Sequence, residues 1–319
     1  MTADKLSPES STLIVGCGYL GNRVVAALNS QFPGSPVYAT TRSAAKASEL
    51  SKVSVEPILA DWTDRRTLAR LPACRRVLVA VSYDARSGKT REESQVGGLS
   101  NLLDFLPSDT DICYISTTGV YHQTDGSWVD ESSPARPRAE GGLAHLRAES
   151  LLHRRRPGGK WTVLRLAGIY GPGRVPRASD VIRGRTIEGP HAGYLNLIHV
   201  EDAAQAVLAS WNLGQPTGKA DASHNRERIY AVADDCPVIR RAFYEQIAKI
   251  AGVAPPVFST ESAGANSAMP SASRSAAFLS SRSGSNKRIW NRRFRRDLMP
   301  RLKFCNYIDG LSAIGLSKG

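Results

Sequence analysis

Short apolar runs alternate with amphipathic segments along the first half of the chain. The runs are typical of buried strands, and the segments between them repeat apolar residues at helical spacing. Such alternation predicts a parallel sheet with helices on both faces, the doubly wound Rossmann type of α/β fold. The predicted strands are 13–15, 37–41, 55–60, 77–81, 112–115, 162–166 and 195–200, and the predicted helices are 19–29, 43–51, 64–71, 92–105, 140–155 and 201–213.

The first predicted strand runs directly into three glycines, Gly16, Gly18 and Gly21, with the spacing G-x-G-x-x-G. The first glycine allows the sharp turn, the second lets the backbone approach a pyrophosphate, and the third lets helix and strand pack closely. The helix that follows, which starts at Tyr19 and Leu20, offers free N–H groups and a positive dipole end to phosphates. The stretch therefore predicts a dinucleotide site, and an ordinary glycine-rich turn is the alternative.

The residue after the second strand distinguishes the two nicotinamide dinucleotides. An acidic side chain there suits a ribose 2′-hydroxyl, whereas a basic one suits a 2′-phosphate. The strand is followed by Arg42, with no Asp or Glu nearby, and a guanidinium can bind a phosphate through two parallel hydrogen bonds. The sequence therefore predicts NADP rather than NAD, and a plain surface arginine is the alternative.

The ends of the next two strands are expected to line the same cleft, because ligands of open α/β sheets bind beyond the carboxyl ends of the strands. Asp61 follows the third strand, and Ala80, Val81 and Ser82 end the fourth. These four residues are predicted on the adenine and ribose sides of the cofactor. Asp61 has a second interpretation, which is to cap the turn near Asp64.

The strand and helix pattern becomes less regular in the second half of the chain. We expect residues 12–170 to form mainly the NADP-binding Rossmann domain, after a polar tail at 1–11. Residues 171–319 are expected to form mainly a smaller C-terminal substrate-binding region, from which 195–213 returns to the Rossmann sheet. The stretch 259–285 is rich in Ser, Ala and Gly, which bury little apolar surface, and it predicts a flexible loop.

The formal net charge of +13 raises the question of a nucleic-acid partner. Much of the charge lies in residues 282–303, where Trp290 and Phe294 are spaced as on one face of a helix. The segment predicts an amphipathic helix with a solvated basic face. The alternatives are a binding site for an anionic substrate or for a polyanion. No nucleic-acid-binding motif is present, so a nucleic-acid partner is not expected.

Five scattered cysteines, with no C-x-x-C pair, indicate a reducing compartment and neither a zinc site nor a disulfide framework. No apolar run of about 18 residues is present, so we expect no membrane span. The polar start of the chain lacks the apolar core of a secretion signal. These features predict a cytoplasmic protein.

Several motifs in the chain resemble those of the extended short-chain dehydrogenase/reductases, the NAD-dependent epimerase/dehydratase family. The resemblance covers nearly the whole length. It implies that a hydroxyl at the end of the fifth strand, here Thr117, polarises the substrate. It also implies that members often dimerise through the two helices placed here at 92–105 and 140–155. Besides the glycine turn, the matching motifs are Ile115–Tyr121, Asp130–Pro134, Leu164–Arg174, Asn196–Ala204, Asn286–Ile289 and Tyr307–Leu311.

The chain departs from this family where catalysis is expected. Family members carry a Tyr followed four residues later by a Lys, and a glutamate usually stands four residues beyond that Lys. If Glu149 is that glutamate, His145 occupies the Lys position and Gly141 the Tyr position. The pair is therefore missing, which resembles the atypical branch of the family.

Three side chains are candidates to replace the missing pair, since positioned acid–base catalysis contributes roughly 10²–10⁴ in rate. Tyr121 lies close to Thr117, Tyr83 follows the fourth strand, and His145 titrates near neutrality on the appropriate helix. Packing roles for the tyrosines and simple exposure of His145 are the alternatives. His199 is expected to fix a loop rather than to react.

Two functions follow from these residues. The first is an NADP-binding oxidoreductase or epimerase-like enzyme acting on a sugar nucleotide or related anionic small molecule. Four arginines in the predicted substrate region suggest that the substrate is anionic. The second is a non-catalytic NADP-binding sensor or scaffold. The four arginines are Arg174, Arg177, Arg183 and Arg185.

Overall fold

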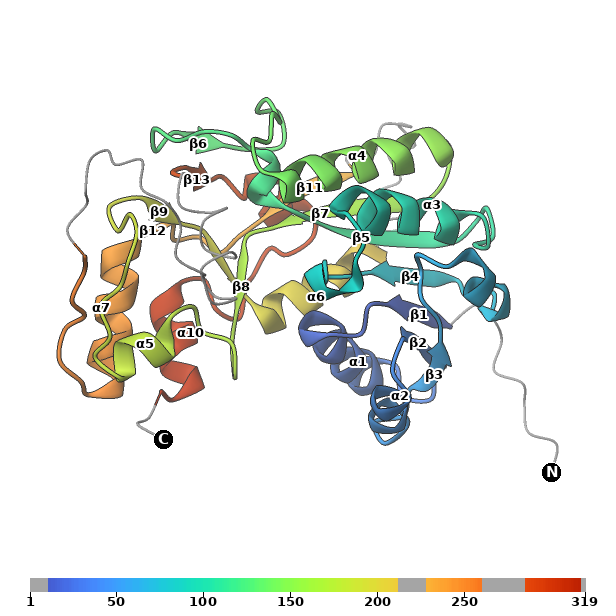
Figure 1. Cartoon of the computed structure of the whole chain (residues 1–319), viewed down its shortest axis with the longest axis horizontal. Helices are drawn as coiled ribbons and strands as arrows, with labels where there is room; N and C mark the ends of the chain where they lie inside the picture. The colour runs from blue at the N-terminus through green and yellow to red at the C-terminus, as the bar shows by residue number, and fades with distance from the viewer. Residues whose placement is uncertain (1–10, 212–227, 260–284, 317–319) are drawn as a thin grey trace.

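A seven-stranded parallel sheet forms the centre of the protein, in a computed structural model that describes residues 11–211, 228–259 and 285–316. The strand order is β11-β7-β5-β4-β1-β2-β3, which confirms the predicted doubly wound Rossmann sheet (Figure 1). The seven strands are β1 (Thr12–Val15), β2 (Val37–Thr41), β3 (Glu56–Leu59), β4 (Arg76–Val79), β5 (Asp111–Thr117), β7 (Trp161–Leu166) and β11 (Ile229–Val232).

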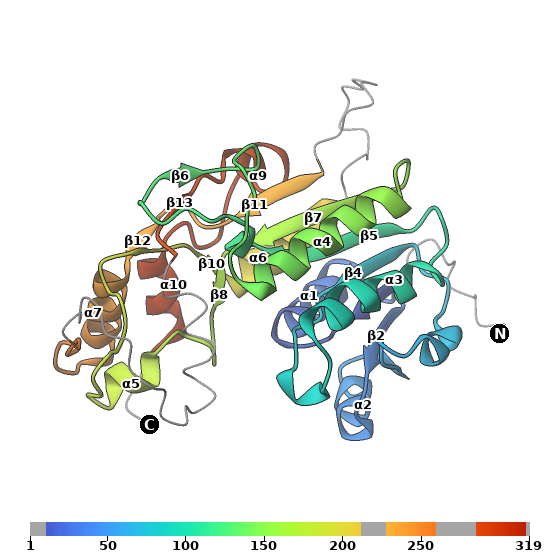
Figure 2. The ribbon, with the colours of Figure 1, turned by 45° about the horizontal axis from the view of Figure 1, so that its top comes forward.

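Helices cover both faces of this sheet (Figures 1 and 2). Because neighbouring residues of a strand point to opposite faces, one strand supplies two cores. Ile14 of β1 packs in the core that contains Val24 and Val207, whereas Leu13 packs in the core that contains Leu102. The helices are α1 (Tyr19–Gln31) and α6 (Val200–Trp211) on the first face, α3 (Gly98–Leu103) and α4 (Glu140–Arg155) on the second, and α2 (Ala44–Ser51) beside β2 and β3.

Local sequence signals set the starts of these helices. α2 begins after Ser43, whose Oγ accepts a hydrogen bond from the backbone N–H of Lys46. α4 covers the predicted range despite two glycines in its first turn, and Gly142 is required there because a Cβ would collide with the carbonyl oxygen of Gly119. The helix predicted at 92–105 differs, since it opens with a π-helical turn at Glu92–Gly97 before α3.

The rest of the chain forms a second region beside the sheet, at the left of Figure 1. Its own apolar core includes Tyr170, Phe243, Ile247 and Leu311. Three two-stranded sheets stabilise it, formed by β8 with β10, β9 with β12, and β6 with β13. The elements are β6 (Trp128–Val129), β8 (Gly168–Tyr170), β9 (Tyr194–Leu195), β10 (Leu197–His199), β12 (Val238–Ile239), β13 (Arg288–Ile289), α5 (Ala178–Ile182), α7 (Arg240–Ala251), α9 (Arg292–Asp297) and α10 (Tyr307–Ile314).

The strand predicted at 195–200 is interrupted at Asn196. The Asn196 side chain bonds to the backbone of Lys287 and Ile289, which separates β9 from β10. β10 pairs with β8 rather than with the central sheet, while α6 packs beside α1 on that sheet. Apart from its two ends, the loop predicted at 259–285 lies outside the described residues.

The amphipathic helix expected in the basic segment is shorter than predicted, since α9 covers only Arg292–Asp297 and leaves Trp290 outside. Trp290 lies between β13 and α9 and packs on Trp128, with 6.0 Å between the ring centroids, whereas Phe294 is buried within α9. The chain is extended before α9 because β13 pairs with β6. Among the described residues, no helix is long and apolar enough to cross a bilayer.

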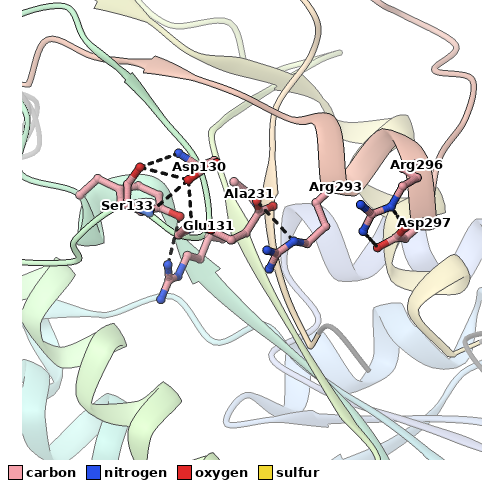
Figure 3. A network of polar contacts seen from close by, with 10 residues as sticks. Asp130, Glu131, Ser133, Ala231, Arg293, Arg296 and Asp297 are labelled. Atoms are coloured by element: carbon pink, nitrogen blue, oxygen red, sulfur yellow. Dashed lines mark hydrogen bonds and ion pairs between the residues drawn. The ribbon is translucent and has the colours of Figure 1, made fainter. Parts of the chain in front are cut away.

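Several basic side chains of this segment pair within the protein. Glu131 is buried, its Oε1 accepts the backbone N–H of Ala231 at 2.7 Å, and its Oε2 lies 3.8 Å from Nε of Arg293 (Figure 3). Arg296 pairs with Asp297 in the same view. The charge of the segment therefore serves in part to join α9 to β11 and to the loop at Asp130–Pro134.

Candidate functional site

The glycine turn after β1 has three distinct environments. Gly16 has a φ of +92°, and a Cβ there would lie 2.8 Å from the backbone of Ala80 and Val81. A Cβ at Gly21 would lie 3.3 Å from Ile14, so helix α1 packs directly on its preceding strand. Gly16 thus serves the turn and Gly21 the packing, as the spacing of the motif predicts.

Gly18 faces open space at the start of α1. A Cβ at Gly18 would meet no atom within 4 Å among the described residues. Gly18 is the N-cap residue of α1, no side chain caps this helix end, and its first turn contains no acidic residue. The N-terminal N–H groups therefore remain available to an anion, and the turn fits the pyrophosphate of a dinucleotide.

The first two residues of α1 have different environments. Leu20 is buried in the core, so only its backbone can face a ligand. The Tyr19 hydroxyl donates a hydrogen bond to the carbonyl oxygen of Pro172 at 3.1 Å, and the guanidinium of Arg174 lies 5.3 Å from the centroid of the Tyr19 ring. Tyr19 thereby connects the glycine turn to the turn after β8.

Arg42 follows β2, as predicted, and its side chain is 53% exposed. It is already engaged by a carboxylate, because Nη2 of Arg42 lies 3.1 Å from Oδ2 of Asp84. Sequence reasoning missed Asp84, which lies 42 residues away in the segment after β4. An acidic group is therefore present near the end of β2 after all.

Asp61 supports its own turn. Its Oδ1 accepts hydrogen bonds from the backbone N–H and the hydroxyl of Thr63, at 2.9 and 2.8 Å. Ala80 donates its N–H to the carbonyl oxygen of Val15, and Val81 accepts a hydrogen bond from the Gln95 side chain. The backbone around these positions is therefore held in place beside the glycine turn. Ser82, the last of the predicted cleft residues, is exposed.

Thr117 ends β5 and caps the short 3-10 turn Thr118–Val120. Its Oγ1 accepts the backbone N–H of Gly119 at 3.0 Å. No acceptor for its hydroxyl hydrogen is found among the described residues. Thr117 can therefore donate to a substrate oxygen at the carboxyl edge of the sheet.

Tyr121 belongs to a buried polar network under this edge. Its hydroxyl accepts a hydrogen bond from Nη1 of Arg165 at 3.0 Å, and burial raises the pKa of Tyr121 to about 12. Arg165 also pairs with Glu149, whose Oε1 accepts from the Ser116 hydroxyl at 2.5 Å. The sequence analysis missed this network. The signal that could have revealed it is Arg165, a charged residue inside the otherwise apolar strand β7. The Tyr121 hydroxyl is thus held in the network.

His145 lies on α4, and its Nδ1 is 2.9 Å from the hydroxyl of the buried Tyr114. Burial, together with the nearby charge of Arg91, lowers the pKa of His145 to about 4. Burial also raises the pKa of Tyr114, so the phenol keeps its proton and shares a hydrogen bond with Nδ1 whose direction depends on the tautomer of the imidazole. His145 is therefore neutral at pH 7 and does not supply the positive charge of a lysine.

Arg91 lies beside the Gly141 position instead. A Cβ at Gly141 would lie 3.5 Å from Nη1 of Arg91. The guanidinium stacks on Tyr83, 4.2 Å from the centroid of its ring, and its Nε lies 3.9 Å from Oε2 of Glu140. Tyr83 in turn donates its hydroxyl hydrogen to the carbonyl oxygen of Lys89 at 2.9 Å. The cation nearest to Gly141 thus comes from the segment before the π-helical turn, which sequence reasoning missed.

Residues 12–219 match the family model described as the NAD dependent epimerase/dehydratase family. The chain belongs to this family. Protein YeeZ of Escherichia coli K12 is 29% identical over 257 residues, which cover 77% of this chain and 85% of YeeZ. The resemblance inferred from the sequence motifs is therefore confirmed.

Two solved structures show the same fold. A conserved protein of unknown function from Silicibacter pomeroyi DSS is 27% identical, with a TM-score of 0.72 and coverage of 96% of this chain and 98% of that protein. DesIV, the dTDP-glucose 4,6-dehydratase of Streptomyces venezuelae with NAD and TYD bound, is 18% identical, with a TM-score of 0.72 and coverage of 95% of each chain. Gly18 and the free N–H groups at the start of α1 form an open cradle for an anion. Family membership and this cradle together indicate that the cofactor is a nicotinamide dinucleotide.

Proposed function

We propose that this protein binds NADP and acts as an oxidoreductase or epimerase on a sugar nucleotide or a related anionic small molecule. The open cradle at Gly18 carries this proposal, because the cradle leaves both space and free N–H groups for a pyrophosphate. Arg42 supports NADP over NAD, since a guanidinium suits a 2′-phosphate. A bound nicotinamide dinucleotide would supply hydride-transfer chemistry.

The chain's own residues orient the substrate in this proposal. Thr117 donates its hydroxyl hydrogen to the substrate oxygen that changes oxidation state. Arg91 provides the positive charge on the α4 side of that oxygen, in the space that Gly141 leaves open. Ala80, Val81, Ser82 and Asp61 line the adenine and ribose sides of the cleft.

Arg174 is proposed to hold the anionic part of the substrate. Its guanidinium stacks on Tyr19, which donates to Pro172, so it is held close to the start of α1. A guanidinium held in this way binds a phosphate with little loss of side-chain freedom. The same contact supports a phosphate-containing substrate class such as a sugar nucleotide.

One observation favours a non-catalytic NADP sensor or scaffold as the second candidate. Tyr121 and His145, two of the side chains considered as substitutes for the missing pair, are both engaged in internal hydrogen bonds. A protein that only binds the dinucleotide needs neither side chain in the cleft. The two candidates predict the same binding and different turnover.

Binding and turnover measurements on the purified protein test these functions. NADPH and NADH affinities are compared for the parent protein and for Arg42→Ala, and equal affinities in the parent would contradict the NADP preference. Oxidation of NADPH is then followed with a panel of carbonyl compounds, and conversion of nucleotide-linked sugars, which involves no net oxidation of NADPH in an epimerase, is followed by product analysis. Thr117→Ala is expected to lower turnover by roughly 100-fold.

Thr118→Ala is the matched control for Thr117→Ala, since Thr118 lies in the same 3-10 turn but does not end the strand. Its turnover is expected to stay near that of the parent. Tight NADPH binding without turnover on any member of the panel would favour the sensor. Equal losses in the two threonine variants would remove the proposed role of Thr117.

A further inference from the structure

Asp84 occupies a rigid position at the carboxyl edge of the sheet. It caps the short 3-10 turn Ala85–Ser87, with its Oδ1 accepting hydrogen bonds from N and Nε of Arg86 at 3.0 and 3.1 Å. The Ser87 hydroxyl donates to the Asp84 carbonyl oxygen at 2.7 Å. These bonds hold the carboxylate in place without any ligand, and its Oδ2 contacts Arg42.

The pair of Arg42 and Asp84 spans the end of β1. β1 lies between β4 and β2 in the sheet, Arg42 follows β2, and Asp84 lies beyond the end of β4. The 3.1 Å contact between them therefore passes over the strand that leads into the glycine turn. A dinucleotide that binds at Gly18 brings its adenosine ribose to this part of the edge.

The carboxylate of Asp84 is charged at every pH near neutrality. Hydrogen bonds from the backbone and side chain of Arg86, and then from Arg42, lower the pKa of Asp84 to about 2. A 2′-phosphate would approach the same guanidinium that this carboxylate already holds. The two anions repel each other and compete for one donor group, whereas a 2′-hydroxyl carries no charge and can donate to the carboxylate.

We propose that Asp84 sets the cofactor selectivity of this protein by competing with the 2′-phosphate of NADP for Arg42. The inference rests on the proposed dinucleotide site. Arg42 alone would favour NADP strongly. Asp84 reduces that preference, so that the affinities for NADP and NAD differ less. The acidic residue that the family fold often carries at the end of the second strand is thus supplied here from the segment after β4.

The test is the ratio of the NADH to the NADPH dissociation constant, measured by fluorescence titration of the full chain at one ionic strength. Asp84→Asn keeps the cap of the turn, because Asn caps as well as Asp, and removes only the charge. The ratio is expected to rise about fivefold, the effect of one unit charge at ~4 Å in a water-like dielectric. The rise should come mainly from tighter NADPH binding.

Asp64→Asn is the matched control. Asp64 caps a 3-10 turn and pairs with Arg66 in the same Asp-x-Arg arrangement, so its carboxylate is held by Arg66 and not by Arg42. This control should leave the ratio unchanged. In the Arg42→Ala background the gain from Asp84→Asn should shrink, because no guanidinium is left to compete for.

Three results would overturn the inference. If the parent and Asp84→Asn bind both dinucleotides with the same ratio, Asp84 does not set selectivity, and the proposed function still stands. An equal gain in the Arg42→Ala background would exclude competition for Arg42. If neither dinucleotide binds the parent protein, the proposed function fails together with the inference.

Discussion

The guanidinium of Arg165 holds the carboxylate of Glu149 through two hydrogen bonds, Nε to Oε1 at 3.1 Å and Nη2 to Oε2 at 2.7 Å. Both side chains are about 95% buried, at 6% and 5% exposure. Removing one partner of a buried pair leaves an unpaired charge. Glu149→Gln is therefore expected to lower the free energy of unfolding by about 3 kcal/mol, measured by urea denaturation.

An exposed ion pair between α4 and the π-helical turn provides the control for Glu149→Gln. Nη1 of Arg147 lies 2.9 Å from Oε2 of Glu92, with both side chains about half exposed. Glu92→Gln should change the free energy of unfolding by only about 0.5 kcal/mol. Similar losses in the two variants would mean that the buried network does not stabilise the fold more than a surface pair does.

Substitutions at two glycines of the turn should affect stability and dinucleotide binding differently. Gly16→Ala places a Cβ 2.8 Å from backbone atoms at a φ of +92°, so it should lower the free energy of unfolding by about 3 kcal/mol. Gly18→Ala meets no atom of the described protein and should cost about 1 kcal/mol or less. Its methyl group enters the cradle instead, and NADPH affinity should fall about tenfold. Denaturation and NADPH titration of both variants check this, and full NADPH affinity in Gly18→Ala would remove the cradle as the binding site.

The partly buried His145 makes stability depend on pH. Its pKa is about 4 in the folded protein and near 6.5 in the unfolded chain, so between these values the unfolded state binds more protons. The free energy of unfolding should therefore fall as the pH falls from about 6.5 to 4, by on the order of 2 kcal/mol from this residue. Urea denaturation at several pH values measures the slope.

His145→Asn should flatten that slope, because the amide group, which has both a donor and an acceptor, can replace Nδ1 as the hydrogen-bond partner of Tyr114 without titrating. His199 is buried with a pKa also lowered to about 4, and it should keep part of the slope in this variant. His153→Asn, at an exposed position of α4, is the control. A slope that His145→Asn leaves as steep as before would show that other groups cause it.

Arg91→Gln should raise the pKa of His145, because the charge of Arg91 disfavours the imidazolium. Burial is the larger cause of the low value, so the pKa should rise but remain below its usual range. NMR titration of the His145 ring measures the change. Arg147→Gln removes an exposed charge from α4 and should leave the His145 pKa in place. An unchanged value in Arg91→Gln would show that Arg91 lies farther from the site in solution.

Six strands of the central sheet were predictable because their signals are local, whereas β11 was not predicted and the strand expected at 195–200 lies outside this sheet. β2 and α4 have the predicted bounds, since a short apolar run and a helical repeat each determine their own element. The π-helical turn at Glu92–Gly97 was not predictable, because its buried Gln95 bonds to Val81 in another segment. The break at Asn196 likewise depends on partners more than 90 residues away.

The residues of the candidate site also fall into those that local sequence predicts and those that only tertiary structure brings together. The glycine turn could be read from spacing alone, because strand, turn and helix are consecutive. Arg42 was found from its place after a strand, but its partner Asp84 depends on the order of strands in the sheet. Arg91 beside Gly141 and Arg165 on Tyr121 are likewise contacts between distant segments. A sequence pattern identifies the residues at a strand end, and tertiary structure decides which charges meet there.

The pairing of β6 with β13 has a consequence for how the protein is made. Gly126, just before β6, accepts a hydrogen bond from Arg288, 162 residues later in the chain. Strands β1 to β5 lie within the first 117 residues and can pair while synthesis continues. β6 can pair with β13 only after residue 289 has left the ribosome. The sheet of β6 and β13 is therefore completed late, and a nascent chain can form its glycine turn well before this sheet.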